Sequence, residues 1–167
     1  ISRNSLSVSQ ACVQLVHDIL GELSLLNVMV IGAGEVGNLA AKALGYSGVR
    51  NMVVTSRTFQ HAKELGKELV ARVIPFSDMP SELSKVDIVI GSTGSPEYII
   101  SKNMIAEAMR KRLTKPMFLM DIAIPRDIDP AVKELDGIFL RNIDDLEHVS
   151  ETNRLEPQQS AQLAQDI

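Results

Sequence analysis

The chain has 167 residues, a formal net charge of −4 and 45% hydrophobic residues. A chain of this length can bury one sizeable core, so one main domain is expected. The acidic balance argues against a surface that coats nucleic acid broadly, although it leaves room for a local contact. No apolar run approaches the roughly 20 residues of a membrane span, and a single cysteine excludes an internal disulfide. We expect a cytoplasmic protein and, because the first residue is Ile1 rather than Met, a piece of a longer or processed one.

The first predicted element is a helix over residues 7–25, where apolar side chains recur at helical spacing. Ser7 or Ser9 is expected to cap its start. Cys12 lies on the apolar face of this helix. It is either a catalytic thiol or a small core residue, and its apolar neighbours favour the core.

From Asn27 onward, short apolar runs alternate with helical stretches. The runs are 28–31, 52–54, 73–74, 88–90, 117–120 and 138–140. The clearest helical stretches are 36–44, 59–70 and 103–111. Near-continuous apolar strands separated by helices are typical of a parallel sheet covered on both faces. The sequence therefore predicts an α/β fold, a doubly wound Rossmann-like parallel sheet with flanking helices.

A glycine-rich turn follows the first of these strands. It comprises Gly32, Ala33, Gly34, Glu35, Val36 and Gly37. In a G-x-G-x-x-G turn the glycines permit the tight turn, the close approach of a pyrophosphate and the packing of the next helix. A side chain at Gly34 is expected to block the pyrophosphate while leaving the fold largely intact. Glu35 is expected to favour the helix dipole rather than act as a base.

The residues after the second strand indicate which dinucleotide binds. An NAD site places an acid there, but residues 38–62 contain no Asp or Glu. Ser56, Arg57 and Thr58 stand at that place instead, and a guanidinium with two hydroxyls suits a 2′-phosphate. The sequence predicts NADP(H), the alternative being that Arg57 is an ordinary solvated loop residue.

The loop after the fourth strand contains Ser92, Thr93 and Gly94. Small hydroxyl residues and glycine allow a ligand to lie close to the backbone. We expect this loop to contact the cofactor, although the same residues also suit a plain turn.

The fifth strand runs into residues 121–130, which carry four charges among apolar residues. Asp121 and Arg126 are expected to form a structural network that positions this loop, the alternative being that Arg126 faces a carboxylate substrate. Ile124 and Pro125 are included among the cofactor-binding residues. The histidines are scattered, and no metal site is predicted.

Taken together, these motifs resemble the NADPH-binding domain of glutamyl-tRNA reductase. The most specific is Asp-Ile-Ala-Ile-Pro-Arg-Asp-Ile-Asp-Pro over residues 121–130. The others are residues 2–9, 32–37, 56–58, 87–96 and 142–146. The resemblance extends over nearly the whole chain, with the motifs in the same order.

The resemblance implies an NADP-dependent oxidoreductase built in three parts. A cysteine of an N-terminal domain takes glutamate from glutamyl-tRNA as a thioester, and the middle domain delivers hydride from NADPH. The product is glutamate-1-semialdehyde for tetrapyrrole (porphyrin) synthesis. Glutamyl-tRNA is then held mainly by other domains, and a missing C-terminal domain makes the full-length protein a homodimer.

Within this chain, residues 1–26 are expected to be a helical segment packed on the nucleotide domain. Residues 27–142 are expected to form the NADP-binding domain, and residues 143–167 to begin the long helix to the dimerisation domain. The family's Ser-Thr-Cys-Asn-Arg motif is absent, so no catalytic residue is assigned and the chain alone is expected to be inactive.

Two departures bear on this resemblance. Ser56 stands where the family usually has Asn, and Pro157 falls within the expected long helix, where proline costs about 3 kcal/mol. Two alternatives remain open, a shikimate-dehydrogenase-like NADP oxidoreductase and a nucleotide-binding module without chemistry.

Overall fold

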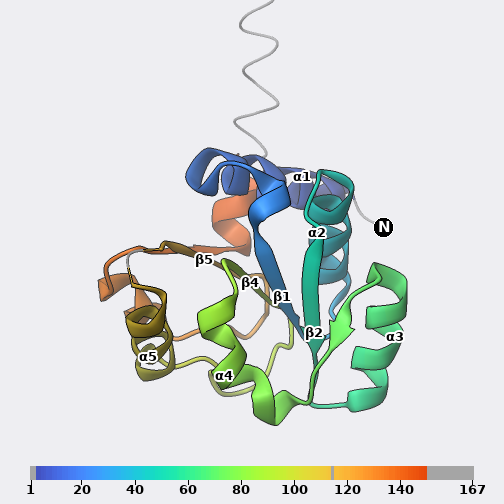
Figure 1. The fold of residues 1–167 in the computed structure, drawn as a ribbon. Helices are drawn as coiled ribbons and strands as arrows, with labels where there is room; N and C mark the ends of the chain where they lie inside the picture. Colours follow the sequence, from blue (N-terminus) through green and yellow to red (C-terminus); the bar gives the residue numbers. More distant parts are fainter. Residues whose placement is uncertain (1–2, 114, 150–167) are drawn as a thin grey trace, which may run out of the picture.

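A parallel sheet of six strands forms the centre of the computed structural model, which describes residues 3–113 and 115–149 (Figure 1). The strand order is β3-β2-β1-β4-β5-β6. The strands are β1 (Asn27–Ile31), β2 (Asn51–Thr55), β3 (Arg72–Val73), β4 (Ile88–Gly91), β5 (Met117–Asp121) and β6 (Ile138–Asn142). Each pair of neighbours is parallel. The predicted Rossmann-like fold is therefore confirmed.

Helices cover both faces of the sheet (Figure 1). They are α1 (Arg3–Leu20), α2 (Glu35–Tyr46), α3 (Phe59–Leu69), α4 (Met79–Glu82) and α5 (Lys102–Arg112). Residues 143–149 are also helical. The three helical stretches predicted after the first strand correspond to α2, α3 and α5.

The two halves of the core follow from strand alternation. Val28 and Val30 of β1 belong to a cluster with α1 and α2, whereas Met29 and Ile31 belong to a second cluster with α4 and α5. Successive side chains of a strand point to opposite faces, so a sheet covered on both sides needs apolar residues at every position. Because all strands run in one direction, their carboxyl ends meet at one edge of the sheet.

The first helix differs from its prediction at both ends. It begins at Arg3, ahead of both serines, and ends at Leu20 rather than at residue 25. Gly21 stops it with a φ of +86°, and its N–H donates to the carbonyl of His17 at 3.0 Å. The Ser9 hydroxyl donates to the carbonyl of Leu6 at 2.8 Å, inside the helix, so it does not cap the start.

Cys12 of α1 is a core residue, as its apolar neighbours indicated. Its side chain has no exposed surface, and it packs in the cluster between α1, α2 and the sheet. Burial raises the pKa of the thiol to about 12. A thiol with this pKa is a poor nucleophile at neutral pH.

The start of the last segment is attached to the domain through Leu146, which is fully buried against the α1 side of the core. The rest of the expected long helix, with Pro157, lies outside the described residues. Among the residues that the structure describes, no helix is long and apolar enough to cross a membrane.

Candidate functional site

The carboxyl end of β1 and the turn after it are fastened to the end of β2 and to the loop that follows β4. Gly32 has a φ of +91°, and its N–H donates to the carbonyl of Thr55 at 2.9 Å. The N–H of Ser92 donates to the carbonyl of Ile31, also at 2.9 Å. Three loops are thus held together at the carboxyl edge of the sheet, where doubly wound folds bind their ligands.

Gly34 and Gly37 are both pressed against Ser92. A Cβ at Gly34 would lie 2.7 Å from the carbonyl oxygen of Ser92, and a Cβ at Gly37 would lie 2.5 Å from its Cβ. Even one methyl group at Gly34 would collide with backbone, so the loop after β4 must shift, and the expectation that the fold stays largely intact remains a prediction. Gly37 allows α2 to pack closely against Ile90 of β4 and against Ser92 in the loop that follows β4.

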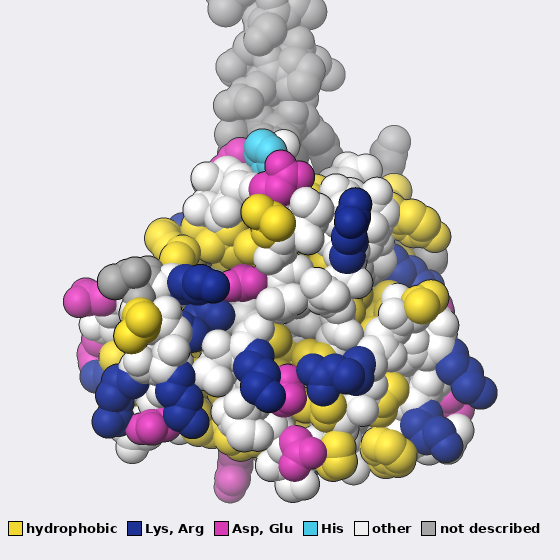
Figure 2. Space-filling model, viewed as in Figure 1, with side chains coloured by type: hydrophobic (Ala, Val, Ile, Leu, Met, Phe, Trp, Pro, Cys, Tyr) yellow, Lys and Arg dark blue, Asp and Glu magenta, His cyan; other side chains and the backbone are white. Residues whose placement is uncertain are grey.

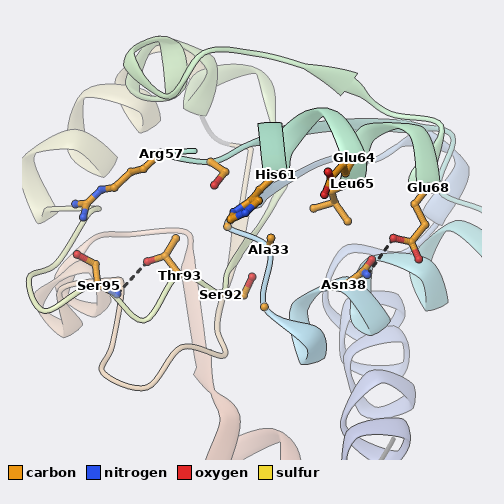
Figure 3. Close-up of a pocket in the computed structure, with 13 residues that line it drawn as sticks. Ala33, Asn38, Arg57, His61, Glu64, Leu65, Glu68, Ser92, Thr93 and Ser95 are labelled. Carbon is orange, nitrogen blue, oxygen red and sulfur yellow. Dashed lines mark hydrogen bonds between the residues drawn. The ribbon is translucent and has the colours of Figure 1, made fainter. Parts of the chain in front are cut away.

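A cleft of about 620 Å³ opens beside this turn (Figure 3). It is lined by Gly32, Ala33, Gly34, Asn38, Ser56, Arg57, His61, Glu64, Leu65, Glu68, Ser92, Thr93 and Ser95. Seven of the predicted site residues are among them, from three loops far apart in sequence. The structure therefore brings together the glycine turn, the Ser-Arg pair after β2 and the hydroxyl residues after β4.

Arg57 lies at one end of the cleft with its cationic group unpaired. Its guanidinium carbon is 5.5 Å from the ring centre of Phe76, and none of the carboxylates that the structure describes forms an ion pair with it. Figure 3 shows Arg57 and Ser95 at one end of the cleft, with Asn38 and Glu68 at the other. The ring contact fixes the position of the guanidinium and leaves its donors for an anion.

Two acids of α3, Glu64 and Glu68, also line the cleft. The sequence analysis did not single them out. Glu68 accepts a hydrogen bond from the side-chain amide of Asn38 at 3.3 Å and forms an ion pair with Lys42. These contacts, first of all the one with Lys42, lower the pKa of Glu68. The acid at this end is therefore charged and matched by a cation of α2. No sequence pattern showed this contact, since it depends on how two helices pack.

Two polar atoms in the wall of the cleft lack a partner among the described residues, the side-chain oxygens of Asn38 and Ser95. Ser95 is only 6% exposed. Buried polar atoms are nearly always hydrogen-bonded, and exceptions need an explanation. A polar ligand in the cleft would provide one.

Ile124 and Pro125 lie outside this cleft. They line a second cavity of about 660 Å³, together with Pro96, Glu97, Tyr98, Arg126, Ile143 and Asp144. Gly94 stands between the two cavities, since a Cβ there would lie 2.9 Å from the carbonyl oxygen of Ile124. Nine of the fourteen predicted site residues thus line one or the other of two adjoining cavities at the same edge of the sheet.

The network predicted around Asp121 exists, but Arg126 is not its partner. The Asp121 carboxylate accepts from the backbone N–H groups of Asp127 (3.0 Å) and Ile128 (2.9 Å) and from that of Ala123. Burial raises the pKa of Asp121, and these hydrogen bonds oppose the rise. Arg126 instead forms an ion pair with Asp144 at 3.2 Å.

Asp127 then connects this loop to the first cleft. It is fully buried, and it accepts hydrogen bonds from the backbone N–H of Thr93 at 2.8 Å and from the Thr93 hydroxyl. The Thr93 oxygen in turn accepts from the N–H of Ser95 at 3.1 Å. The loop after β5 therefore sets the shape of the loop after β4, which is a role that the sequence did not assign to Asp127.

The remaining predicted residues have structural positions. Glu35 is the exposed first residue of α2, Val36 packs against the core, and Thr58 precedes α3. None of these three lines the first cleft. The residues that the structure describes contain no group of His, Cys, Asp and Glu side chains placed to hold a metal ion.

Comparison with known proteins places this geometry in a family. The model of the shikimate / quinate 5-dehydrogenase family matches residues 14–149. A glutamyl-tRNA reductase of Thermodesulfovibrio yellowstonii is 44% identical over all 167 residues, and one of Priestia megaterium is 44% identical over 161 residues. A solved structure of glutamyl-tRNA reductase from Methanopyrus kandleri is 34% identical, with a TM-score of 0.88 over 92% of this chain.

The chain spans only part of these relatives. It covers 39% of the Thermodesulfovibrio protein, 36% of the Priestia protein and 39% of the Methanopyrus chain. Over the matched part, the sequence similarity is continuous and the fold is the same. The chain therefore belongs to the shikimate / quinate 5-dehydrogenase family, and within it is similar to glutamyl-tRNA reductases along its whole length.

Proposed function

We propose that this chain is the NADP(H)-binding domain of a glutamyl-tRNA reductase. The observation that carries the proposal is the 44% identity to a glutamyl-tRNA reductase, in an alignment that spans all 167 residues of the chain. The enzyme reduces the glutamyl group of glutamyl-tRNA to glutamate-1-semialdehyde, for tetrapyrrole synthesis. Because the relatives are far longer, the substrate-activating residues and the dimer contacts are assigned to other domains.

The first cleft fits the phosphate part of a dinucleotide. Its wall includes the backbone of Gly32, Ala33 and Gly34, directly before α2. No side chain caps the start of α2, so the N–H groups of its first turn are available to an anion. The unpartnered oxygens of Asn38 and Ser95 add hydrogen-bonding capacity for the sugar and base.

Arg57 supports NADP(H) over NAD(H). Its guanidinium is unpaired at the end of the cleft, and Ser56 lies beside it. A 2′-phosphate would receive charge-assisted hydrogen bonds from the Arg57 guanidinium. A 2′-hydroxyl carries no charge, so it would not gain this ionic attraction. The two acids that line the cleft, Glu64 and Glu68, lie on α3 and not directly after β2, and Glu68 is already paired with Lys42.

The second cavity suits the nicotinamide end. It adjoins the first at the contact between Gly94 and Ile124 and is walled by Pro96, Tyr98 and Pro125. NADPH, when bound, supplies a hydride. The chain's contribution is to hold the wall of this cavity in place: Asp121 and Asp127 bind backbone N–H groups on either side of Ile124 and Pro125 and in the loop after β4.

The acyl group must arrive from elsewhere in the full-length protein. Hydride transfer needs an activated acyl carbon, and a thioester provides one, with the thiolate leaving as the aldehyde forms. Cys12 cannot form it, because it is fully buried and its pKa is raised to about 12. We therefore expect no turnover of glutamyl-tRNA by this chain alone. NADPH oxidation by the isolated chain, lost on Cys12→Ala without unfolding, would contradict this assignment.

Calorimetric titration of NADPH and NADH tests the cofactor. We expect tighter binding of NADPH, and we expect Arg57→Gln to weaken it by about 1.5–3 kcal/mol while leaving NADH binding unchanged. Arg50→Gln is the matched control, because Arg50 is exposed and lies outside the cleft. Equal affinities for the two cofactors in the unaltered chain would overturn the NADP(H) proposal.

The family description itself supports a second candidate, oxidation of shikimate or quinate with the same dinucleotide. The identity to glutamyl-tRNA reductases over the entire chain favours the first candidate. Incubation of the chain with NADP and shikimate or quinate separates the two, since NADPH formation would support only the second.

A further inference from the structure

The opposite edge of the sheet carries two cavities of about 450 and 530 Å³, which share Asn27 and Lys85. The first lies at the amino ends of β3, β2 and β1, and the second at those of β1, β4 and β5. These strands are consecutive in the sheet, so the two cavities, with their shared residues, form one lined stretch of this edge. We call it the amino-edge groove. With strands about 4.8 Å apart, it extends about 19 Å across the sheet.

Exposed cations from separate parts of the chain line this groove. They are Arg50, Arg72, Lys85, Lys111 and Lys115. They come from the starts of β2 and β3, the segment before β4, the end of α5 and the segment before β5. In Figure 2, Lys and Arg side chains are spread over the visible face, over α3 as well as over α4 and α5, with Asp and Glu side chains among them. In the groove, these five exposed cations outnumber the acids Glu82 and Asp87, whereas the whole chain has a net charge of −4.

The acids of the groove do not cancel these cations. Glu82 is paired with Arg72 at 3.1 Å and with Lys85 at 3.5 Å, but the two cationic side chains remain 60% and 69% exposed. Asp87 is paired with the buried Arg112 at 2.9 Å. Arg112 also donates to the carbonyls of Val86 and Pro116, so it belongs to the framework.

Helix stability does not explain the cluster. A cation in the last turn of a helix is favourable with the dipole, which accounts for Lys111 of α5 and for Lys85 at the end of the short 3-10 helix Leu83–Lys85. Arg50, Arg72 and Lys115 lie outside the helices. Leu25 and Leu113 add apolar surface to the groove and are 77% and 82% exposed. A rim of this kind fits a macromolecule better than a free anion.

We propose that the amino-edge groove binds the phosphate backbone of RNA. A row of exposed cations along a channel of this length neutralises several consecutive phosphates. The site is distinct from the dinucleotide cleft, and the RNA contact rests on the proposed function, whose substrate carries a tRNA. The tRNA named for the relatives is the natural probe.

Fluorescence anisotropy with labelled, uncharged tRNA tests the proposal on this chain. The test variant is Lys111→Gln with Lys115→Gln, and the control is Lys63→Gln with Lys67→Gln on α3. The two pairs remove the same charge, and each includes one lysine from the last turn of a helix. At roughly 50 mM salt we expect the test pair to weaken binding about tenfold and to reduce the slope of log affinity against log salt by about 2.

A third variant, Arg50→Gln, probes the other end of the groove without touching α5. It should weaken tRNA binding and lower the salt slope by about 1, even if the lysine pair destabilises the chain. NADPH titration of each variant keeps the two proposals apart, because none of these residues lines the dinucleotide cleft. Equal losses in the groove and α3 pairs, no tRNA binding by the unaltered chain, or binding unaffected by Arg50→Gln would overturn the proposal.

Discussion

The two edges of the sheet are built on different principles. At the carboxyl edge, backbone groups make the shape: glycines without room for a methyl group, and buried carboxylates that bind neighbouring N–H groups. At the amino edge, long exposed side chains surround an open channel. A backbone site is specific in geometry and sensitive to small changes. A charged side-chain site is tolerant of substitution and sensitive to salt.

The carboxylates show the same contrast. Asp121 and Asp127 are almost completely buried and hold two loops in place through backbone hydrogen bonds. Glu82 is also buried, but its partners are not backbone groups: it pairs with two cationic side chains that remain well exposed. Removing an acid should therefore have very different consequences at the two edges.

The largest effect is expected from Asp121→Ala. The substitution leaves the N–H groups of Ala123, Asp127 and Ile128 without their acceptor in a buried loop. Each unsatisfied group costs about 1–3 kcal/mol, so we expect a loss of about 3–5 kcal/mol in the free energy of unfolding. Urea denaturation measures this loss.

Asp129→Ala in the same loop is the control, because the Asp129 carboxylate accepts a hydrogen bond from the N–H of Ala131 and caps a short helix. It should cost about 1 kcal/mol. Similar losses in the two variants would show that burial of Asp121 is unimportant.

A smaller loss is expected from Gly34→Ala. The new Cβ would lie 2.7 Å from the Ser92 carbonyl oxygen, so the loop after β4 must shift. We expect a cost of about 1–3 kcal/mol together with weaker NADPH binding. Gly45→Ala in α2, the helix that follows Gly34, is the control, since its Cβ would meet only Met52 at 3.7 Å. It should gain up to about 1 kcal/mol and leave cofactor binding unchanged. Thermal unfolding and calorimetry of both variants check this, and a fully stable Gly34→Ala would mean that the turn is less rigid than its geometry indicates.

The sequence was sufficient for the architecture because the signal is repeated. Six apolar runs, each followed by a turn or a helix, permit few arrangements other than a parallel sheet covered on both faces. The end of α1 was missed because the apolar pattern continues through residues 23–25 after Gly21 has stopped the helix. The short helix α4 was missed because its four residues are too few to show the 3.6-residue spacing of apolar side chains that marks a helix.

The site was predictable where one segment contributes a motif and not where two segments meet. The glycine turn and Arg57 could be identified from spacing alone. The collision of Gly34 with Ser92, the pair between Glu68 and Lys42, and the bond from Thr93 to Asp127 each join residues distant in sequence. Arg126 was assigned to Asp121 because they share a loop, whereas its partner Asp144 lies 18 residues further along.

The smallest effect is expected at the amino edge, from Arg72→Gln. Hydrogen bonding to Arg72 lowers the pKa of Glu82, so the pair stabilises the fold at pH values above the usual pKa of Glu, near 4.5. This contribution is lost as the pH falls through the lowered pKa, where Glu82 takes up a proton in the folded state too. Because Arg72 is 60% exposed and Lys85 remains beside Glu82, we expect a loss of no more than about 1 kcal/mol at neutral pH.

Urea denaturation at a series of falling pH values should show that the difference in unfolding free energy between Arg72→Gln and the unaltered chain shrinks toward zero. Lys102→Gln, which breaks the exposed pair with Glu134, is the control and should have a still smaller effect. A loss from Arg72→Gln as large as that from Asp121→Ala, or one that grows in acid, would mean that the amino edge depends on its carboxylate as strictly as the carboxyl edge does.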